Sequence, residues 1–299
     1  MLVGHYTDNI NEGTMKPRTL QIHLQKELSR LYDAHEAAAI ATRYVTDRFG
    51  LSTAQLLLND DVLLSAAEEE QTQRDVEQLL AQVPVQQVVG FEWFCGHRFR
   101  VTADTLIPRP ETEGLVRLAT ERCCGALSNI LDVGTGSGCI AISLAKILPL
   151  ARVAAWDISE GALQVAQANA TTLGASVDFQ LRDVLKEAET PTITPQSLDA
   201  IVSNPPYIPE AEAQTMEAQV VNHEPHSALF VPNDNPLLFY HALARLGWHA
   251  LRPSGSLLVE THTDFAAAVA TLFESMGYTS VCVINDCFNL PRFVEGVWK

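Results

Sequence analysis

The tetrapeptide Asn204-Pro205-Pro206-Tyr207 has residue types that suit chemistry on a planar amino group. The side-chain oxygen of Asn204 and the backbone carbonyl of Pro205 can accept two N–H bonds, which would hold the nitrogen in line with a methyl donor and stabilise its growing positive charge. Proline fixes φ and restricts the residue before it to an extended conformation, so both acceptors are held in a fixed orientation before the substrate binds. Tyr207 offers a flat face on which a planar target can stack. An ordinary Asn-Pro turn after a strand would also account for these residues.

A glycine-rich turn lies upstream, between an apolar strand and a helix. Residues 129–133 form the predicted strand, Gly134, Gly136 and Gly138 follow it, and an apolar helix begins at Cys139. Glycines allow a nucleotide cofactor to approach the backbone closely. The GxGxG spacing differs from the GxGxxG of dinucleotide-binding folds, and such a loop alone is a weak signal. It indicates a nucleotide-cofactor loop whose ligand must be inferred from other residues.

Two carboxylates follow the next two predicted strands. Asp157 lies nineteen residues after Gly138, where a carboxylate commonly binds both ribose hydroxyls of a cofactor. An Asp before Ser159 is also a normal helix cap. Asp183 can accept a hydrogen bond from an adenine amino group while Val184 packs on the ring. Each motif comes at the carboxyl end of a predicted strand, which is where open α/β sheets bind their ligands.

Together these motifs resemble those of class I S-adenosylmethionine-dependent methyltransferases. Residues 106–113, with the sequence Leu-Ile-Pro-Arg-Pro-Glu-Thr-Glu, are similar to a signature of the protein-glutamine N5-methyltransferases (HemK-like), some of which act on peptide-chain release factors. Further matches are residues 85–90, 222–229 and 292–296, and the resemblance covers residues 18–299. The tetrapeptide is shared with adenine-N6 DNA methyltransferases, whereas the proline-rich segment, residues 106–113, is restricted to fewer families.

The resemblance implies S-adenosylmethionine as the cofactor and methyl transfer to the N5 nitrogen of a protein glutamine. The implied substrate is the Gly-Gly-Gln loop of a release factor, with N5-glutamine methylation of a ribosomal protein or adenine-N6 methylation of nucleic acid as alternatives. The implied catalytic residues are Asn204, Pro205, Pro206 and Tyr207. The implied cofactor-binding residues are Asp132, Gly134, Thr135, Gly136, Ser137, Gly138, Asp157, Ile158, Asp183, Val184, Asn204, Arg109 and Glu111.

Two roles are open for Arg109 and Glu111 in the proline-rich segment. The segment can fold over the methionine end of the cofactor, with one or both side chains fixing the loop. It can equally be a rigid linker whose prolines only shape the chain.

Composition and charge limit the classes of protein to which the chain can belong. The chain has 299 residues, 47% hydrophobic and 19% charged, which is an ordinary globular composition, and its length favours two domains. The net charge of −16 argues against stable nucleic-acid binding, because such binding needs Lys and Arg to neutralise phosphates, and it is compatible with a basic protein partner. No uncharged apolar stretch of eighteen residues predicts a membrane span, and residues 1–14 lack the apolar core of a signal peptide.

The cysteines show neither CxxC pairing nor metal-ligand spacing with histidine. We interpret them as reduced, mostly buried thiols of a cytoplasmic protein, and we expect no metal site. They are Cys95, Cys123, Cys124, Cys139, Cys282 and Cys287.

Other function classes explain fewer of the motifs. A nicotinamide dehydrogenase would use the glycine loop and Asp157 but would leave the tetrapeptide without a role, and a nucleotide-binding module would need no pair of amino-group acceptors. Acyl transfer lacks support because the chain has no GxSxG motif. A scaffold protein remains a third class, distinguished by failure to bind S-adenosylmethionine.

The chain is expected to divide into four segments. Residues 1–17 form a disordered extension, and residues 18–83 form a helical domain. By resemblance this domain recognises the substrate, although a bundle that only stabilises the fold suits its residues equally well. Residues 84–103 form a β-hairpin linker with strands near 86–89, 92–95 and 97–101, preceded by the helix-breaking Pro84. Residues 104–299 form the S-adenosylmethionine-dependent methyltransferase domain.

Strands and helices alternate through this last segment. Such alternation predicts an α/β fold with a mainly parallel sheet covered on both faces, here a seven-stranded class I methyltransferase (Rossmann-like) sheet beside a small N-terminal helical domain. Strands are expected near 129–133, 152–157, 176–181, 198–203, 255–260, 278–284 and 292–298, and helices near 111–124, 138–147, 159–173, 236–251 and 264–276. The last two strands are too close for a helical crossover, so one must run antiparallel.

Overall fold

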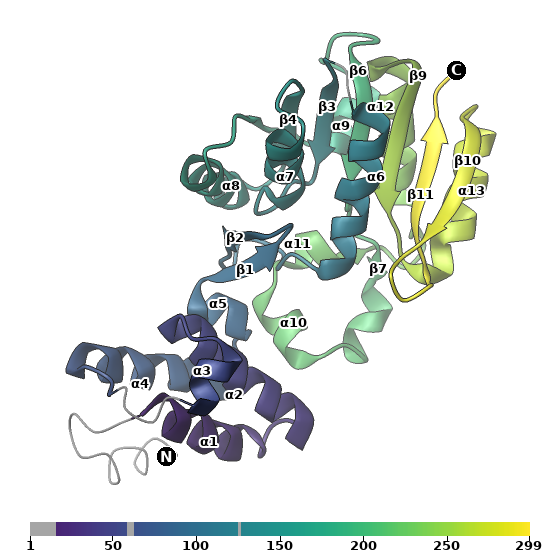
Figure 1. Ribbon diagram of the computed structural model, residues 1–299. Helices are drawn as coiled ribbons and strands as arrows, with labels where there is room; N and C mark the ends of the chain where they lie inside the picture. The colour runs from purple at the N-terminus through teal and green to yellow at the C-terminus, as the bar shows by residue number, and fades with distance from the viewer. Residues whose placement is uncertain (1–15, 59–62, 125–126) are drawn as a thin grey trace. The chain divides into compact units, whose positions relative to one another are not determined.

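The computed structural model of the protein describes residues 16–58, 63–124 and 127–299 (Figure 1). The extension expected over residues 1–17 lies outside the described residues as far as residue 15. Pro17, at the end of that expected segment, is already the first residue of a helix.

The chain divides into two compact units, here named the helical unit and the sheet unit. The helical unit ends at Gly90 but also contains Ala218–His223, and the sheet unit contains the remainder from Phe91 onward. The boundary therefore falls inside residues 84–103, the stretch expected to link the domains. Ala218–His223, expected within the methyltransferase domain, is grouped with the helical unit instead.

Apolar residues at helical spacing build the core of the helical unit. Leu20, Leu24 and Leu28 lie on one face of the first helix and are almost fully buried, together with Tyr44 and Val45 of the second. The described helices of this unit are α1 (Pro17–Leu28), α2 (Ala34–Phe49), α3 (Thr53–Leu58), α4 (Ala66–Leu80), α5 (Val85–Val89) and α10 (Ala218–His223).

Helix α5 corrects one sequence prediction, because residues 86–89 were expected to form a strand. Val85 and Val88, three residues apart, are both buried in the helical unit, and Gly90 ends the helix in a left-handed conformation with φ +87°. Two valines at helical spacing outweighed the strand preference of the β-branched residues.

Helix α10 is held within the helical unit by side chains. Gln87 Nε2 donates to the backbone oxygen of His223 at 2.9 Å, and the His223 ring nitrogen lies 3.3 Å from the backbone oxygen of Ala81. Gln219 Nε2 donates to Glu36 at 3.4 Å. A segment from the middle of the expected catalytic domain is thus part of the N-terminal unit.

The sheet unit contains a seven-stranded sheet of the order β10-β11-β9-β6-β3-β4-β5. Strands β9, β6, β3, β4 and β5 pair in parallel, whereas β11 runs antiparallel to both of its neighbours. This confirms the fold class and the antiparallel final pair. The strands are β3 (Asn129–Val133), β4 (Arg152–Asp157), β5 (Asp178–Leu181), β6 (Leu198–Ser203), β9 (Leu251–Glu260), β10 (Thr279–Asn285) and β11 (Pro291–Val297).

Helices cover both faces of this sheet, because successive strand residues point to opposite sides. Ile130 and Val202 pack against one group of helices, and Leu131 and Ile201 against the other. The first group comprises α6 (Glu113–Cys123), α7 (Cys139–Ile147) and α8 (Glu160–Leu173); the second comprises α9 (Val184–Glu189), α12 (Leu238–Ala250) and α13 (Ala266–Ser275) (Figure 1). Of these, α9 was not predicted.

A β-hairpin opens the sheet unit. Cys95 and Gly96 at its turn both have positive φ, as two-residue hairpin turns require. Asn169 holds the hairpin in place, because its side chain accepts from the backbone N–H of Arg100 at 2.8 Å and donates to the backbone oxygens of Arg100 and Ser137. The remaining elements are β1 (Phe91–Phe94), β2 (His97–Arg100), β7 (Ile208–Pro209), β8 (Phe230–Val231), α11 (His226–Leu229) and the short 3₁₀ helices Pro110–Thr112, Glu210–Gln214 and Thr263–Phe265.

The burial of the cysteines differs from expectation. Cys123 and Cys139 are buried, whereas Cys124, Cys282 and Cys287 are exposed, so most of these thiols are not in the core. Within the described ranges, every helix is too short or too polar to cross a membrane.

Candidate active site

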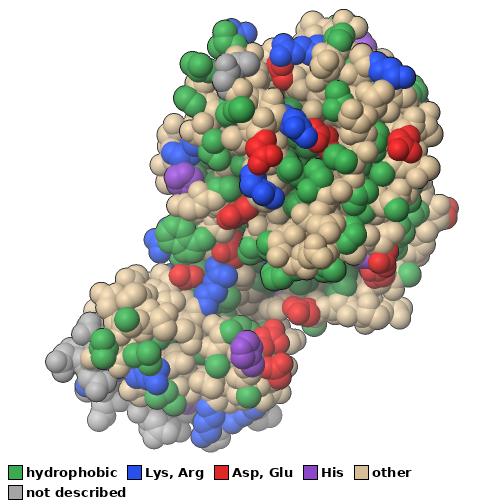
Figure 2. Space-filling model, turned by 45° about the vertical axis from the view of Figure 1, so that its right-hand side comes forward, with side chains coloured by type: hydrophobic (Ala, Val, Ile, Leu, Met, Phe, Trp, Pro, Cys, Tyr) green, Lys and Arg blue, Asp and Glu red, His purple; other side chains and the backbone are tan. Residues whose placement is uncertain are grey.

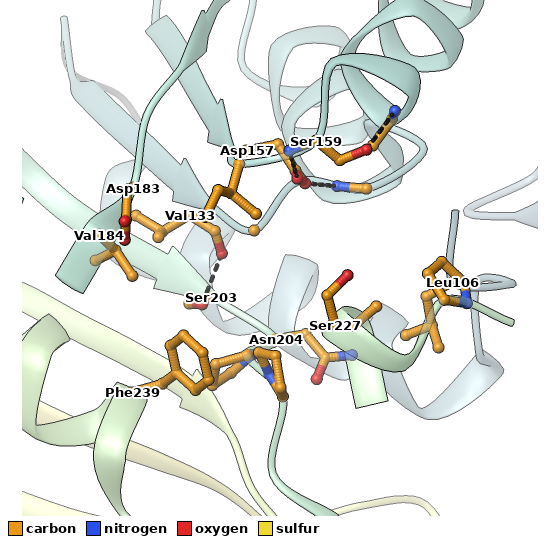
Figure 3. A pocket seen from close by; sticks show the side chains of 18 of the residues that line it. Leu106, Val133, Asp157, Ser159, Asp183, Val184, Ser203, Asn204, Ser227 and Phe239 are labelled. Atoms are coloured by element: carbon orange, nitrogen blue, oxygen red, sulfur yellow. Dashed lines mark hydrogen bonds between the residues drawn. The ribbon is translucent and has the colours of Figure 1, made fainter. Parts of the chain in front are cut away.

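A cavity of about 300 Å³ lies at the carboxyl ends of the parallel strands. Gly134, Asp157, Asp183 and Asn204, each named by a different sequence motif, all line it (Figure 3). Its size matches the lower end of the range for small-molecule sites, about 300–1,000 Å³. The structure therefore brings the separate motifs to one cavity, as open α/β sheets do.

Backbone conformation explains the glycines after β3. Gly134, Gly136 and Gly138 all have positive φ, at +74°, +55° and +81°. Gly134 and Gly136 line the cavity. A Cβ on Gly138 would lie 2.8 Å from Ile142 Cδ1, so this glycine lets helix α7 pack closely. The loop thus presents backbone to the cavity at its first two glycines and packs inward at the third.

Asp132 supports the loop from behind and does not line the cavity. It is fully buried, and its Oδ2 accepts from the Thr135 hydroxyl at 2.7 Å and from the backbone N–H of Ala141 at 3.2 Å. Burial raises the pKa of Asp132 to about 7. Thr135 and Ser137 are also buried, and Thr135 braces the loop through its bond to Asp132.

Asp157 lies on the cavity and also binds the glycine loop. One carboxylate oxygen accepts from the backbone N–H of Gly136 at 2.8 Å and the other from that of Ser159 at 2.9 Å. Burial, opposed by these donors, raises the pKa of Asp157 above its ordinary value. The helix cap of α8 is Ser159, whose hydroxyl accepts from Ala162 N–H. Asp157 therefore orients the loop beside the cavity instead of capping that helix.

Asp183 caps the unpredicted helix α9. Its side chain accepts from the backbone N–H of Leu185 at 3.0 Å. Asp183, Val184 and Leu185 all line the cavity, as does Ile158 beyond β4. Both carboxylates, Asp157 and Asp183, and the apolar residues that follow them in sequence therefore belong to the cavity wall.

The tetrapeptide separates into a cavity-lining part and a supporting part. Asn204, Pro205 and Pro206 line the cavity, whereas Tyr207 is not among its lining residues. The Tyr207 hydroxyl donates to Glu260 at 3.3 Å, and its ring meets His262 edge-on at 6.2 Å between centroids. The Tyr207 ring therefore contacts His262, and another residue contributes an aromatic ring to the cavity lining.

That residue is Phe239, at the start of α12. Phe239 and Ser227 both line the cavity together with Asn204 (Figure 3). Sequence reasoning missed both Phe239 and Ser227. Phe239 belongs to an ordinary amphipathic helix pattern, which marks it no differently from a core residue.

Glu260 is a third residue that sequence reasoning missed. It ends β9, is 2% exposed, and its Oε2 accepts from the Thr112 hydroxyl at 2.7 Å. Burial raises the pKa of Glu260 to about 7. An acid at the end of an apolar strand is the signal that identified Asp157, and residues 257–260 carry the same signal.

Arg109 and Glu111 do not line the cavity, although Leu106 does. The Arg109 guanidinium lies 2.5 Å from Glu224 Oε1, and Glu224 Oε2 accepts from the backbone N–H of Ile107 at 2.9 Å. The Glu224 side chain is 1% exposed. One buried carboxylate thus fixes the proline-rich segment, and Arg109 takes part in fixing it.

Known proteins resemble the chain over nearly its whole length. Family models match residues 113–229 (Methyltransferase small domain) and 23–90 (PrmC N-terminal domain). The release factor glutamine methyltransferase of Bacteroides thetaiotaomicron is 40% identical over 91% of this chain and 96% of its own, and that of Geobacter sulfurreducens is 34% identical over 95% and 99%. A solved protein-(glutamine-N5) methyltransferase (release factor-specific) from Alicyclobacillus acidocaldarius is 28% identical, with a TM-score of 0.40 over 67% of this chain and 99% of its own.

The Arg109–Glu224 pair leads to a stability prediction. Arg109→Ala leaves the buried Glu224 carboxylate without its counter-charge, and we expect the free energy of unfolding to fall by about 2 kcal/mol. The expected loss is smaller than the roughly 3–5 kcal/mol typical of fully buried pairs, because the Arg109 side chain is 34% exposed and water moderates the loss. Denaturant unfolding followed by circular dichroism measures the change.

The Glu224→Gln substitution supplies the matched control. Added to Arg109→Ala, it should recover part of the lost stability, because the amide oxygen can still accept from Ile107 N–H without carrying a buried charge. Equal stability of Arg109→Ala and the wild type would show that the pair does not fix this segment.

Proposed function

The chain belongs to the release factor glutamine methyltransferases, and we propose that it methylates the side-chain amide nitrogen of a glutamine in a peptide-chain release factor. Membership of this family makes it a methyltransferase that uses S-adenosylmethionine. The observation that carries the proposal is the position of Asn204 and Pro205 on the wall of the cavity that also contains Asp157 and Asp183. Acceptors for an amino group and groups suited to a nucleoside therefore share one site.

The cavity wall fits the cofactor that the family uses. Gly134 and Gly136 let a ligand approach the backbone, Asp157 can bind ribose hydroxyls, and Asp183 with Val184 can hold adenine. When bound, S-adenosylmethionine supplies an electrophilic methyl group on a sulfonium. Asp132 and Thr135 serve this site by supporting the loop from behind, and Ser137 is buried in the same loop.

Asn204 and Pro205 would act directly on the reacting nitrogen. An amide nitrogen is conjugated and so weakly basic that no side chain has to remove its proton before attack. Positive charge grows on the nitrogen during transfer, and the Asn204 side-chain oxygen and the Pro205 carbonyl stabilise it by accepting its two N–H bonds. The proton leaves to water after the methyl group has arrived.

Charge favours a protein substrate over nucleic acid. The chain carries a net charge of −16, and on the face shown in Figure 2 basic side chains of the sheet unit are interspersed with acidic ones. A duplex-binding adenine methyltransferase would need a basic surface for phosphates and would have to flip its target base. Relatives named for release factor glutamine methylation also favour release factors over a ribosomal protein.

The substrate is tested by incubating the enzyme with S-adenosylmethionine carrying a labelled methyl group. We expect label on the glutamine of the Gly-Gly-Gln loop of a release factor, located by mass spectrometry of its peptides. Parallel arms contain ribosomal proteins and adenine-containing duplex DNA. Label on DNA with release factors left unmodified would overturn the proposed substrate.

Asn204→Ala tests the amino-group acceptors. We expect turnover to fall on the order of a hundredfold or more, as when one preorganised electrostatic partner is lost from an active site. The affinity for S-adenosylmethionine should change much less, because the groups proposed to hold the nucleoside remain. Near-normal turnover in the variant would reduce the tetrapeptide to a structural turn.

Asp157→Ala tests the ribose site. We expect S-adenosylmethionine affinity, measured by calorimetric titration, to fall more than about tenfold, since a hydrogen bond to a charged group contributes roughly 1.5–3 kcal/mol. Asp178→Ala removes an equal charge from an exposed position at the start of β5 and should bind normally. Unchanged affinity in Asp157→Ala would remove this carboxylate from the site.

A further inference from the structure

The orientation of the Asn204 amide depends on a buried carboxylate outside the cavity lining. We propose that Glu260 is a positioning residue for methyl transfer, which acts through the Thr112 hydroxyl to keep the Asn204 side-chain oxygen available to the substrate. This inference rests on the proposed role of Asn204 as an amino-group acceptor.

The amide of asparagine has two orientations of nearly equal shape. One presents Oδ1 to a partner and the other presents Nδ2, and the surrounding hydrogen bonds decide between them. A substrate amide offers N–H donors, so only the orientation with Oδ1 toward it is productive. Among the described residues none donates to Asn204 Oδ1, whereas Asn204 Nδ2 donates to Thr112 Oγ1 at 3.3 Å.

The Thr112 hydroxyl links Glu260 to Asn204. It has one hydrogen, and at 2.7 Å Glu260 Oε2 is its acceptor. An ionised carboxylate can only accept, so Thr112 must give it that hydrogen. Thr112 then has only lone pairs left for Asn204, and these attract Nδ2. The direction of the chain from Asn204 through Thr112 to Glu260 is therefore set by the carboxylate.

The same carboxylate also holds the other end of the tetrapeptide. Glu260 Oε1 accepts from the Tyr207 hydroxyl at 3.3 Å. Glu260 is placed for both contacts by the sheet, because β6 and β9 pair in parallel with Ser203 opposite Val259. Asn204 and Glu260 are therefore each one residue beyond the last pair between β6 and β9. The backbone oxygen of Glu260 accepts from Tyr240 at 3.2 Å, which anchors this strand end.

Several charged or titratable groups surround Glu260. Arg292 of β11 favours the ionised form, Glu111 disfavours it, and the hydroxyls of Thr112 and Tyr207 favour it by donating. His262, which packs on the Tyr207 ring, itself lies 3.6 Å from Glu212. Burial is the largest effect and raises the pKa of Glu260 to about 7.

Protonation of Glu260 should reverse the hydrogen-bond chain. A neutral carboxyl can donate to Thr112, which frees the Thr112 hydrogen for Asn204 Oδ1 and favours the unproductive orientation of the amide. Turnover should therefore be highest above a pH of about 7 and fall as the pH drops through that value. Asp132 titrates in the same range, so the comparison must be made with a variant that lacks only the Glu260 titration.

Glu260→Gln is that variant. Tyr207 donates to the other oxygen of residue 260, so the glutamine oxygen should face Tyr207 and the amide nitrogen should donate to Thr112, which gives the reversed chain at every pH. We expect kcat with a release factor to fall on the order of thirtyfold, with KM and S-adenosylmethionine affinity changed less than about threefold. In this variant kcat should no longer fall because of Glu260 protonation as the pH drops, while any pH dependence due to Asp132 remains.

Thr112 variants distinguish a positioning role of Glu260 from a purely structural role. Thr112→Val, which keeps the shape but lacks the hydroxyl, should lower kcat to a similar degree, and Thr112→Ser should restore most of the loss. The Glu260→Gln/Thr112→Val double variant should be little worse than either single variant, because both interrupt one chain. Glu295→Gln is the matched control, since Glu295 of β11 is similarly buried at 1% exposure but pairs with Arg122 of α6, outside the cavity lining.

Each outcome decides the proposal. Selective loss of kcat in Glu260→Gln and Thr112→Val, with Thr112→Ser active and Glu295→Gln near wild type, supports it. Retention of kcat within about threefold in folded Glu260→Gln overturns it. A parallel loss of stability, cofactor affinity and kcat without rescue by Thr112→Ser also overturns it, because Glu260 would then be only a structural brace. A wild-type enzyme unable to modify any release factor rejects the proposed function itself, and the role of Glu260 falls with it.

Discussion

The parallel pairing of the central strands is the constraint on which the site depends. Val133 of β3 is opposite Trp156 of β4 and Ser203 of β6, and Ser203 is opposite Val259 of β9. Backbone hydrogen bonds hold these residues level, so the residue after each strand emerges at the same edge of the sheet. A shift of one residue would turn the side chains of a strand to the opposite face and dismantle both the packing and the site.

Buried carboxylates hold the irregular segments that this edge carries. Asp132 and Asp157 bind the glycine loop, Glu224 binds the proline-rich segment, and Glu260 binds the hydroxyl next to Asn204. Each side chain accepts at least one backbone N–H or hydroxyl, which offsets the cost of removing its charge from water. The offset is incomplete for three of them, because burial still raises the pKa of Asp132, Asp157 and Glu260.

The chain between the tetrapeptide and helix α12 serves both units in turn. It leaves the sheet unit, contributes Ala218–His223 to the helical unit, and returns at Glu224. His223 is bonded within the helical unit, whereas its neighbour Glu224 is bonded to the segment beside the cavity. A continuous backbone therefore joins the helical unit to Glu224, the residue that holds Ile107 and Arg109.

The sequence by itself determined the order of the elements and the edge of the sheet that carries the candidate site. Alternating apolar strands and amphipathic helices, with glycine, proline and acidic residues at the strand ends, predicted the sheet and placed Gly134, Asp157, Asp183 and Asn204 together, because those signals are local in the chain. Tertiary structure alone decided which buried side chains support the segments around the cavity. Glu260 meets Thr112 across 148 residues and Glu224 meets Ile107 across 117. Such pairs leave no periodic signal, since their geometry comes from how the strands pair and not from spacing. For the same reason the sequence could not show that Phe239 faces the cavity while Tyr207 turns to a buried carboxylate.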